Sequence, residues 1–472
     1  MNSRASFLFS AAALLAACGS TTPAATPAPS AKPSSPAASA PAASASAKPA
    51  SSAAPASAIA ASKPAAAASG ASIKIGLDES LTGSFATIGK DHQDGFTLYM
   101  ESINNTIAGR KVEVVTVDDG GRPDQGLTKA KQLVESDKVH LITGVHISPI
   151  CNALVGFAKE AQVPLAITGN CPNQNLMTDP KIKNPYTTRF SEVASASSDV
   201  AADWAYKNGQ RKATLMVNDI VGGLELADAF ASAFIKRGGA VVQEQYAALG
   251  TADFGPFLAQ LSPEADMIMA LEAGADGLRF GQQIASYTGQ RKLQIMGVFA
   301  GPASPISLAE LKDKMLGSVG IEVYCGCNDT PANQAFIQAW KAKYPGRVAS
   351  TDAAQGWSGG QILEAAIKKV NGNVEDKDKL SEALRQTNVE TAKGPIKLDQ
   401  DNDLVSNNYV YQVVKQGDGV GYKLLETYKE IGRGWDRNAQ ELTNFPFGKM
   451  RGKWAGMTKD KLDQVIKTGQ PG

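Results

Sequence analysis

Short apolar segments alternate with longer amphipathic segments from Ile73 onward, with a repeat of about thirty residues that is typical of βαβ units. The apolar segments favour strands and cover 73–77, 112–117, 139–143, 164–168, 213–217, 240–246 and 266–271. The amphipathic segments predict helices over 89–105, 124–136, 151–161, 196–207, 223–236, 254–261 and 276–287. Alternating strands and helices build parallel sheets, and the chain has enough units for two. The pattern therefore predicts an α/β fold of two doubly wound parallel-sheet lobes.

The loops that follow the predicted strands are the expected place for a ligand, because open parallel sheets bind ligands beyond the carboxyl ends of their strands. Several of these loops are rich in glycine and small polar residues and carry single aromatic residues. Such loops can bring backbone N–H groups and hydroxyls close to a small molecule. The loops to consider are 78–88, 118–124, 144–150, 169–175, 218–223, 272–276 and 297–305.

The first 17 residues have the pattern of a signal peptide. Arg4 is followed by an apolar run of about half the ~20 residues that a membrane span requires. The run ends in Leu15-Ala16-Ala17-Cys18, which resembles the lipobox of bacterial lipoproteins. This resemblance implies that 1–17 is removed and that Cys18 is lipidated and becomes the mature N-terminus. The alternative is a plain secretory signal followed by an incidental cysteine.

Residues 19–71 consist almost entirely of Ala, Pro, Ser, Thr and Lys, without an aromatic residue. Such a segment cannot bury enough apolar surface to offset the entropy lost on ordering. We therefore expect 18–71 to be a lipidated cysteine followed by a disordered tether. The tether would keep the folded part near the extracytoplasmic face of a bacterial membrane, in the periplasm or at the cell surface.

The charge of the chain is balanced, with 47 Lys and Arg against 46 Asp and Glu among 472 residues. Four of the basic residues lie within 1–71, where no acidic residue occurs, which leaves the remainder with 43 basic and 46 acidic residues. Nucleic-acid binding depends on clustered positive charge. The sequence therefore predicts no nucleic-acid partner.

Four cysteines follow Cys18, and an even number in an exported protein favours disulfides. Cys151 and Cys171 can pair if their loops are adjacent, whereas Cys325-Gly326-Cys327 would close a small, strained ring, which disfavours a bridge there. The cysteines lack the C-x2-C spacing of zinc sites, and the chain has only 3 His. No metal or cofactor is predicted.

Three segments resemble catalytic motifs but lack what the chemistry needs. Gly83 to Lys90 has five residues between its glycines, and Asp91 follows the lysine, so the P-loop pattern fails. Gly356-Trp357-Ser358-Gly359-Gly360 fits the nucleophile elbow of hydrolases, but all histidines precede it and no strand does. The adjacent Asp118 and Asp119 point to opposite faces of a strand, and we expect them to cap the following helix. No enzyme is predicted.

Several motifs together resemble a known family. They are Leu81-Thr82-Gly83-Ser84-Phe85-Ala86 after the first strand, Val117-Asp118-Asp119, Gly144 with Ser148, Gly394-Pro395-Ile396, and late strands over 409–414 and 422–428. In order and spacing they resemble the periplasmic leucine/isoleucine/valine-binding proteins, type I solute-binding proteins of ABC importers. The resemblance covers about 73–431.

This resemblance implies a monomeric clamshell in which three hinge segments join the lobes and closure buries a small ligand. One lobe would hold 72–191 and 325–397, and the other 192–324 and 398–432; 433–472 is an extension without an assigned role. The closed form would dock on a membrane permease. A ligand-sensing domain of the same fold is an alternative.

The resemblance also implies a ligand site, in which Ser148 and the loop after the fourth strand hold a substrate carboxylate. That loop, with Gly169 and Asn170, departs here from the usual pattern of the family. His146, two residues before Ser148, either has a structural role or donates a hydrogen bond to the anion. Amino-acid binders of the family place an acidic residue after the strand at 295–297, but this chain has Phe299 there. An apolar or aromatic carboxylate is therefore favoured over a branched-chain amino acid or small amide, whose nitrogen would need Glu272 or Asp276. The remaining predicted contacts are Ser84, Phe85, Ile220, Val221 and Trp357.

Overall fold

The computed structural model describes residues 70–272, 274–287, 293–298 and 301–471. Cys18, the predicted signal peptide, the tether as far as residue 69, and Phe299 lie outside the described residues. In the described part, no helix combines the length and apolar character that crossing a membrane requires.

The first lobe contains a six-stranded sheet in the order β2-β3-β1-β4-β5-β6. All neighbouring strands are parallel except the short hairpin between β2 and β3. The alternating Ile73, Ile75 and Leu77 of the central strand are fully buried. The strands are β1 (Ile73–Glu79), β2 (Thr106–Ile107), β3 (Arg110–Asp118), β4 (Leu141–Gly144), β5 (Leu165–Ile167) and β6 (Thr187–Arg189).

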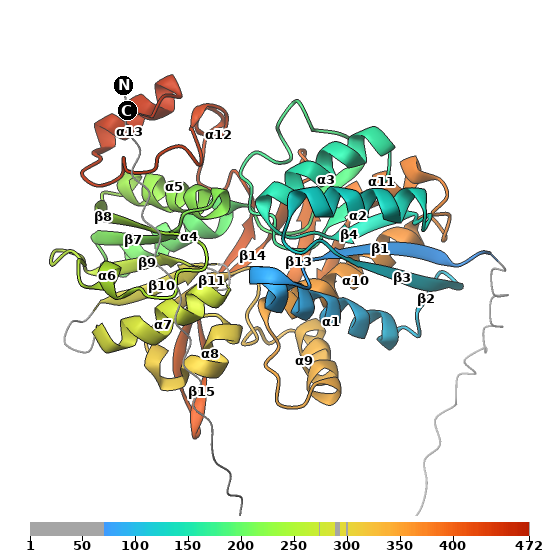
Figure 1. The fold of residues 1–472 in the computed structure, drawn as a ribbon, viewed down its shortest axis with the longest axis horizontal. Coiled ribbons are helices and arrows are strands. Elements are labelled where there is room, and N and C mark those ends of the chain that lie inside the picture. Colours follow the sequence, from blue (N-terminus) through green and yellow to red (C-terminus); the bar gives the residue numbers. More distant parts are fainter. Residues whose placement is uncertain (1–69, 273, 288–292, 299–300, 472) are drawn as a thin grey trace, which may run out of the picture. The chain divides into compact units, whose positions relative to one another are not determined.

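Helices cover both faces of this sheet (Figure 1). On one face lie α2 (Pro123–Glu135) and α3 (Ser148–Ala161), and on the other α1 (Ala86–Ser102) and α10 (Thr351–Lys369). Two more helices of the late chain, α9 (Pro331–Lys343) and α11 (Lys377–Arg385), belong to the same lobe because Trp340 and Leu380 are buried in its core.

The segment that resembles a nucleophile elbow lies inside α10, where its glycines permit close helix packing. A Cβ at Gly356 would lie 2.0 Å from the carbonyl oxygen of His92, and one at Gly95 would lie 2.0 Å from that of Ala353. The two helices therefore approach each other backbone to backbone. Trp357 is buried in the core of this lobe, against the ring of Tyr99.

The second lobe contains a nine-stranded sheet in the order β12-β13-β14-β11-β10-β9-β7-β8, with β15 paired to β14. Strands β7 to β11 are parallel, and β14 joins them antiparallel. The parallel strands are β7 (Lys212–Asn218), β8 (Ala240–Ala247), β9 (Met267–Leu271), β10 (Gln294–Val298) and β11 (Val319–Glu322). The antiparallel strands are β12 (Asn388–Thr391), β13 (Gly394–Leu398), β14 (Leu404–Gln416) and β15 (Gly419–Ile431).

Helices also flank both faces of the second sheet, with α4 and α5 on one face and α7 and α8 on the other (Figure 1). The helices are α4 (Ala194–Lys207), α5 (Val221–Lys236), α6 (Gly255–Leu258), α7 (Ala275–Tyr287) and α8 (Pro305–Leu311), and the short turn η3 (Lys312–Met315) follows α8. A similar turn, η1 (Gly83–Phe85), precedes α1 in the first lobe. The predicted α/β fold of two lobes with parallel sheets is therefore confirmed.

The chain passes between the lobes after β6, after β11 and near β13. At the first passage Arg189 forms a buried ion pair with Asp403, at 2.6 Å between Nε and Oδ1. The third passage complicates the predicted lobe boundary at 397/398. Strand β13 is hydrogen-bonded to β14 in the second sheet, yet its Ile396 is buried in the core of the first lobe.

The C-terminal extension packs on the second lobe through α12 (Ala439–Asn444) and α13 (Lys459–Thr468), which lie beyond α5 (Figure 1). Phe445, Phe447 and Trp454 are buried in the same core as α4 and α5. The Trp454 indole N–H donates to Asp228 Oδ1 of α5 at 2.7 Å. The extension is thus an integral part of the second lobe.

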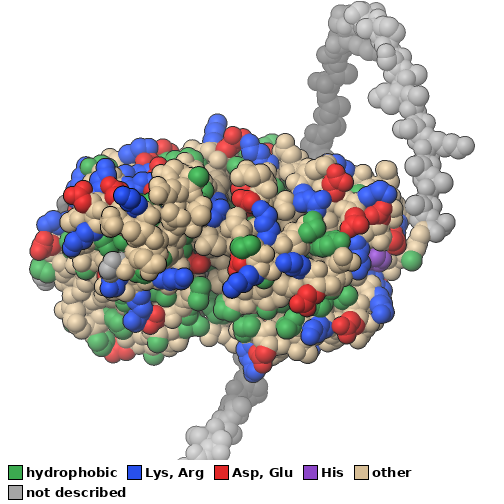
Figure 2. Space-filling view, turned by 90° about the horizontal axis from the view of Figure 1, so that it is seen from above, with side chains coloured by type: hydrophobic (Ala, Val, Ile, Leu, Met, Phe, Trp, Pro, Cys, Tyr) green, Lys and Arg blue, Asp and Glu red, His purple; other side chains and the backbone are tan. Residues whose placement is uncertain are grey.

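Charged side chains are distributed without a dominant sign on the face shown in Figure 2. Lys and Arg are interspersed with Asp and Glu there. That face has no continuous basic surface of the kind that binds a nucleic-acid backbone.

Candidate functional site

A cavity of about 280 Å³ lies between the two lobes. It is lined by loops that follow strands in both sheets, as expected for parallel sheets. Six of the predicted ligand contacts line this cavity: Phe85, His146, Ser148, Asn170, Ile220 and Val221. The other lining residues are Ile88, Gly121, Ile147, Pro149, Pro172, Asn218, Gly222, Gly223, Leu226, Leu249 and Leu271.

Most of the cavity wall is apolar. Phe85 and Ile88 come from the start of α1 in the first lobe, and Leu226 and Leu271 come from α5 and β9 in the second. An apolar wall of this kind binds hydrocarbon or ring surfaces through burial.

Two helix N-termini supply the polar part of the cavity. Helix α3 begins at Ser148 and α5 at Val221, and neither helix has a side-chain hydrogen bond at its N-cap. The first amides of a helix have no intrahelical acceptor and carry the positive end of the helix dipole. The two helices also lie close together, because a Cβ on Gly222 would be 3.3 Å from Ser148 Oγ. The cavity therefore suits an anionic group.

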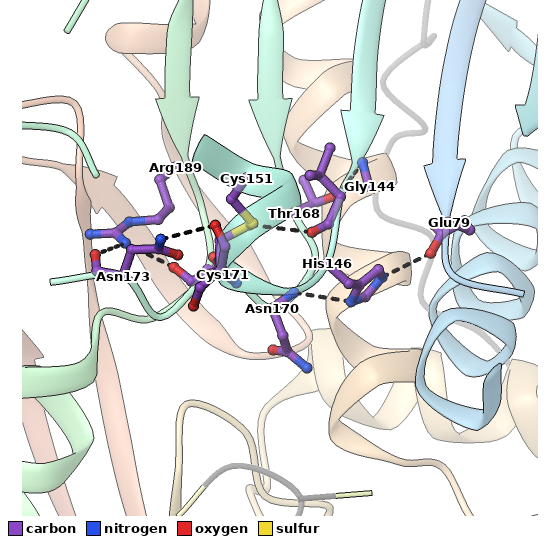
Figure 3. Close-up of a disulfide and its surroundings, with 12 residues drawn as sticks. Glu79, Gly144, His146, Cys151, Thr168, Asn170, Cys171, Asn173 and Arg189 are labelled. Carbon is purple, nitrogen blue, oxygen red and sulfur yellow. Dashed lines mark hydrogen bonds and ion pairs between the residues drawn. A yellow bond between two sulfur atoms is a disulfide. The ribbon is translucent and has the colours of Figure 1, made fainter. Parts of the chain in front are cut away.

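The loop between β4 and α3 has a strained backbone. Val145 and Ile147 have φ values of 69° and 70°, in the left-handed region that β-branched residues rarely adopt. The Ile147 N–H donates to the Asn170 carbonyl at 2.9 Å. A disulfide links Cys151 of α3 to Cys171 in the loop that contains Asn170 (Figure 3). Strain of this kind persists where surrounding contacts hold it, often at binding sites.

His146 belongs to a buried hydrogen-bonded triad with Glu79 and His92. Its Nε2 lies 2.8 Å from Glu79 Oε2 (Figure 3). The Nδ1 of His92 lies 2.6 Å from Glu79 Oε1. Burial raises the pKa of Glu79, but the two histidines outweigh burial and lower this pKa below its usual value. Glu79 is therefore an ionised acceptor for both rings.

The triad also leaves His146 without a free N–H for a ligand. The backbone N–H of Asn170 donates to His146 Nδ1 at 3.1 Å, so Nδ1 is unprotonated and Nε2 carries the proton that Glu79 accepts. In this structure His146 shapes the cavity wall, which differs from the predicted role as hydrogen-bond donor to the ligand.

The same geometry decides whether the triad suits a metal ion, since its ligand atoms all lie within 4.8 Å of one another. A metal bound to His146 Nε2 would require the proton on Nδ1, where it would face the Asn170 N–H. The donor set thus fits a hydrogen-bonded group and does not fit a cation site.

Asn170 lines the cavity, and its side-chain amide is held by Asp352 of the first lobe. Its Nδ2 donates to Asp352 Oδ1 at 2.6 Å, and its Oδ1 is buried without a hydrogen-bond partner among the described residues. Burial raises the pKa of Asp352 to about 7. As bonded here, Asn170 suits a ligand hydroxyl or N–H.

The other predicted contacts lie outside the cavity lining. Trp357 is in the core of the first lobe, and Ser84 lies near Gly274 of the second lobe. Gly169 packs on the triad, because a Cβ there would be 2.7 Å from His146 Nε2. Glu272 is fully buried, and burial, followed by the charge of Asp276, raises its pKa to about 8.

Two expectations about neighbouring residues need correction. Asp118 and Asp119 do not cap α2, whose N-cap is Arg122. They instead order the loops that follow β1 and β3. Asp118 accepts from the N–H groups of Leu81 and Gly120, and Asp119 accepts from the Ser80 hydroxyl. A second disulfide joins Cys325 to Cys327, which the sequence disfavours; the turn brings their Cα atoms to 5.0 Å, within the usual range for a bridge.

Sequence reasoning identified most of the loops that form the cavity but not all of their residues. Gly222, Gly223 and Asn218 lie in the predicted loop 218–223, and the adjacent glycines were a usable signal for open amides. His92 and Glu79 gave no such signal, because their contacts with His146 join residues far apart in the chain.

The sequence profile of the family described as Periplasmic binding protein matches residues 72–418. The Leu/Ile/Val-binding protein homolog 6 of Brucella suis biovar 1 (strain 1330) is 27% identical over 366 residues, which cover 76% of this chain and 92% of that protein. Membership of a family of periplasmic binding proteins implies an extracytoplasmic location.

Two solved structures share the fold. An ABC transporter substrate-binding protein from Sphaerobacter thermophilus matches with a TM-score of 0.72 and 30% identity, covering 76% of this chain and 99% of that one. A solute binding protein of an ABC transporter from Rhodopseudomonas palustris BisB5, in complex with 3,4-dihydroxy benzoic acid, matches with a TM-score of 0.70 and 27% identity, covering 77% and 99%. Such proteins bind substrates and are not enzymes. The chain therefore belongs to the periplasmic leucine/isoleucine/valine-binding protein family and is a substrate-binding protein of an ABC transporter.

Proposed function

We propose that this protein captures a small aromatic or apolar carboxylate between its lobes and delivers it to a membrane permease. The observation that carries the proposal is the pair of uncapped helix N-termini of α3 and α5, which meet at an otherwise apolar cavity. A carboxylate would accept hydrogen bonds from the Ser148 hydroxyl and the first amides of α5. Its ring or chain would contact Phe85, Ile88 and Leu271.

The Rhodopseudomonas palustris neighbour supports the aromatic class, because it was solved with a hydroxylated benzoic acid. A ring hydroxyl would suit the Asn170 Oδ1 acceptor. The cavity volume, near the lower end of the roughly 300–1,000 Å³ of known ligand pockets, favours a compact ligand.

A branched-chain amino acid is the second candidate, since the Brucella suis relative is named for leucine, isoleucine and valine. Its ammonium group would need a carboxylate partner, because an unpaired buried charge is costly. Glu272 is the candidate partner, but it does not line the cavity, and its pKa of about 8 leaves it mostly protonated at neutral pH.

We further propose that the protein is a lipoprotein anchored through Cys18, with 18–71 as the tether. The signal-like sequence before Cys18 and the low-complexity segment after it support this proposal. Mass spectrometry of membrane-extracted protein tests the anchor. A diacylglyceryl adduct at Cys18 that is absent from Cys18→Ala is expected, and an unmodified Cys18 contradicts the proposal.

Isothermal titration of the full chain with benzoate, 3,4-dihydroxybenzoate, leucine and valine tests the ligand class. We expect binding of the two aromatic acids and none of the amino acids. Ser148→Ala is expected to weaken benzoate binding about tenfold, the effect of losing one hydrogen bond to a charged group. The control Ser102→Ala, at the exposed end of α1, should leave affinity unchanged.

Two results would contradict this assignment. Binding of leucine or valine alone would mean that Glu272 or Asp276 pairs with an ammonium group. Benzoate binding that Ser148→Ala leaves unaltered would place the carboxylate away from the α3 N-terminus.

A further inference from the structure

The second disulfide, Cys325–Cys327, differs from the first in its surroundings. It lies just after β11, where the chain returns from the second lobe to the first, and Cys327 lines a separate cavity of about 540 Å³. Residues of both lobes line that cavity, among them Leu308 of α8 and Trp340 of α9. Cys327 is partly exposed, whereas Cys151 and Cys171 are both fully buried. A thiol can therefore reach one bridge and not the other.

The two bridges also constrain the unfolded chain to different extents. Cys325 and Cys327 are separated by 2 positions, and Cys151 and Cys171 by 20. In the chain-entropy description, the stabilisation from a disulfide grows with the length of the loop it closes. The short bridge therefore contributes less to folding, and its reduction removes less stability.

The turn provides a stabilised leaving group at Cys325. The backbone N–H of Cys327 points to Cys325 Sγ at 3.1 Å. Attack on the partly exposed Cys327 Sγ would expel the Cys325 thiolate, which this N–H can stabilise. Thiol–disulfide exchange is faster when the leaving thiolate is stabilised.

The turn keeps other anchors when the bridge is open. The Cys325 carbonyl accepts the Asn328 N–H at 2.9 Å, and Asn328 Nδ2 donates to the Tyr409 hydroxyl at 3.0 Å. That hydroxyl donates in turn to the Lys393 carbonyl at 2.9 Å. The segment thus stays attached to the other passages between the lobes without the disulfide.

We propose that Cys325–Cys327 is a thiol–disulfide exchange site that a small dithiol reduces in the folded protein. One thiolate of the dithiol attacks Cys327 Sγ, forms a mixed disulfide and releases the Cys325 thiolate. The second thiolate of the dithiol then attacks the dithiol sulfur that is bonded to Cys327 Sγ. A ring closes, and the Cys327 thiolate is released. The dithiol becomes a cyclic disulfide as it loses two electrons, and its two protons pass to Cys325 and Cys327.

Differential alkylation of the folded full chain carrying Cys18→Ala tests the proposal. The protein is equilibrated with a dithiothreitol series and quenched with iodoacetamide, and each cysteine-containing peptide is quantified by mass spectrometry. We expect half-labelling of Cys325 and Cys327 at a dithiothreitol concentration at least about tenfold below that for Cys151 and Cys171. Circular dichroism at each concentration checks that the chain stays folded.

Matched variants separate exchange from unfolding. Cys325→Ser/Cys327→Ser should retain the labelling curve of Cys151 and Cys171, and Cys151→Ser/Cys171→Ser should retain early labelling of the other pair. The proposal fails if all four cysteines are labelled together, if labelling of Cys325 and Cys327 coincides with loss of the folded spectrum, or if both are free thiols before dithiothreitol is added. The dithiothreitol titration needs only the Cys18→Ala protein, so its result holds even if one of the double variants does not fold.

Discussion

At the scale of single residues, the buried Glu79 is the group on which the cavity wall depends. It accepts hydrogen bonds from His92 and His146, which lies between two residues with strained backbone. A carboxylate that receives two ring N–H groups holds both rings in one orientation. The loop between β4 and α3 is therefore held in its conformation before a ligand binds.

Glu79→Gln tests this arrangement. The amide has one acceptor oxygen and would leave one imidazole N–H buried and unpaired, so we expect a loss of about 3 kcal/mol in the free energy of unfolding, measured by urea denaturation. Glu113→Gln, at an exposed position on β3, should change stability by less than about 0.5 kcal/mol. Equal losses in the free energy of unfolding from Glu79→Gln and Glu113→Gln would show that the triad does not stabilise the fold.

Glu272 makes stability depend on pH. Its pKa of about 8 in the folded protein exceeds the ordinary 4.5, so between these values the folded state keeps a proton that the unfolded state has released. Stability contributed by this proton is present below the ordinary pKa and is lost as the pH rises toward 8. Glu192, with a pKa raised to about 8 by burial, acts in the same direction.

We therefore expect the melting temperature to fall as the pH is raised from about 5 to about 8, and to fall less in Glu272→Gln. Differential scanning calorimetry at three pH values measures both slopes. Glu135→Gln, exposed on α2, should keep the parent slope. A slope that Glu272→Gln leaves unaltered would mean that Glu272 is ionised in the folded protein.

Residue roles were harder to predict than residue positions. Ser148 and Phe85 line the cavity as expected, because each lies in a loop after a strand. The bonding of His146 depends on the Asn170 amide and on Glu79, which are 24 and 67 positions away, and no local pattern encodes those contacts. Trp357, a predicted ligand contact, does not line the cavity for a related reason: the packing of α10 against α1 buries its side chain in the core.

At the scale of elements, alternation of apolar and amphipathic segments correctly located most strands and helices between β1 and α7. Helix α3 begins at Ser148 and α5 at Val221, earlier than the amphipathic pattern indicates, because their first turns carry glycine, proline or serine. Strands β2 and β6 were missed because two or three residues carry no periodicity.

The C-terminal extension is expected to stabilise the second lobe through its buried aromatic side chains. Trp454 is fully buried, and its N–H is bonded to Asp228, so Trp454→Ala should cost about 3–5 kcal/mol in urea unfolding. Trp435→Ala is the matched control, because that side chain is 37% exposed, and its loss should cost less than about 1 kcal/mol. Similar losses in both variants would contradict the packing described for the extension.

At the scale of the whole molecule, the ion pair between Arg189 and Asp403 ties together two of the passages between the lobes. Arg189 also donates to the carbonyl groups of Cys171 and Asn173, in the loop that reaches the cavity (Figure 3). Arg189→Met would leave a buried carboxylate without its partner and should destabilise the protein by about 3–5 kcal/mol.

The double variant Arg189→Met/Asp403→Leu distinguishes pairing from packing. Removing both charges should recover part of the loss in the free energy of unfolding, since no unpaired charge remains. A double variant less stable than Arg189→Met would show that Asp403 stabilises the fold independently of Arg189.

Only the resemblance to a family predicted which segments of the chain make up each lobe. Apolar periodicity reports local elements, and it does not tell which strands share a sheet or that 325–385 returns to the first lobe. The pairing of β13 with β14 across the expected boundary shows the same limit. Nonlocal pairing is decided by tertiary contacts that periodicity leaves open.

The packing of the extension has a consequence for genetic variation. The family match ends at residue 418, yet the core of the second lobe includes residues as late as Ile466. A premature stop codon after Gly432 would leave all of the residues that match the family, 72–418, in the product. Its product would expose the apolar surface that Phe445, Trp454 and Leu462 normally cover, and we expect the cell to degrade it. Nonsense mutations that remove Phe445, Trp454 and Leu462 together should therefore behave as null alleles.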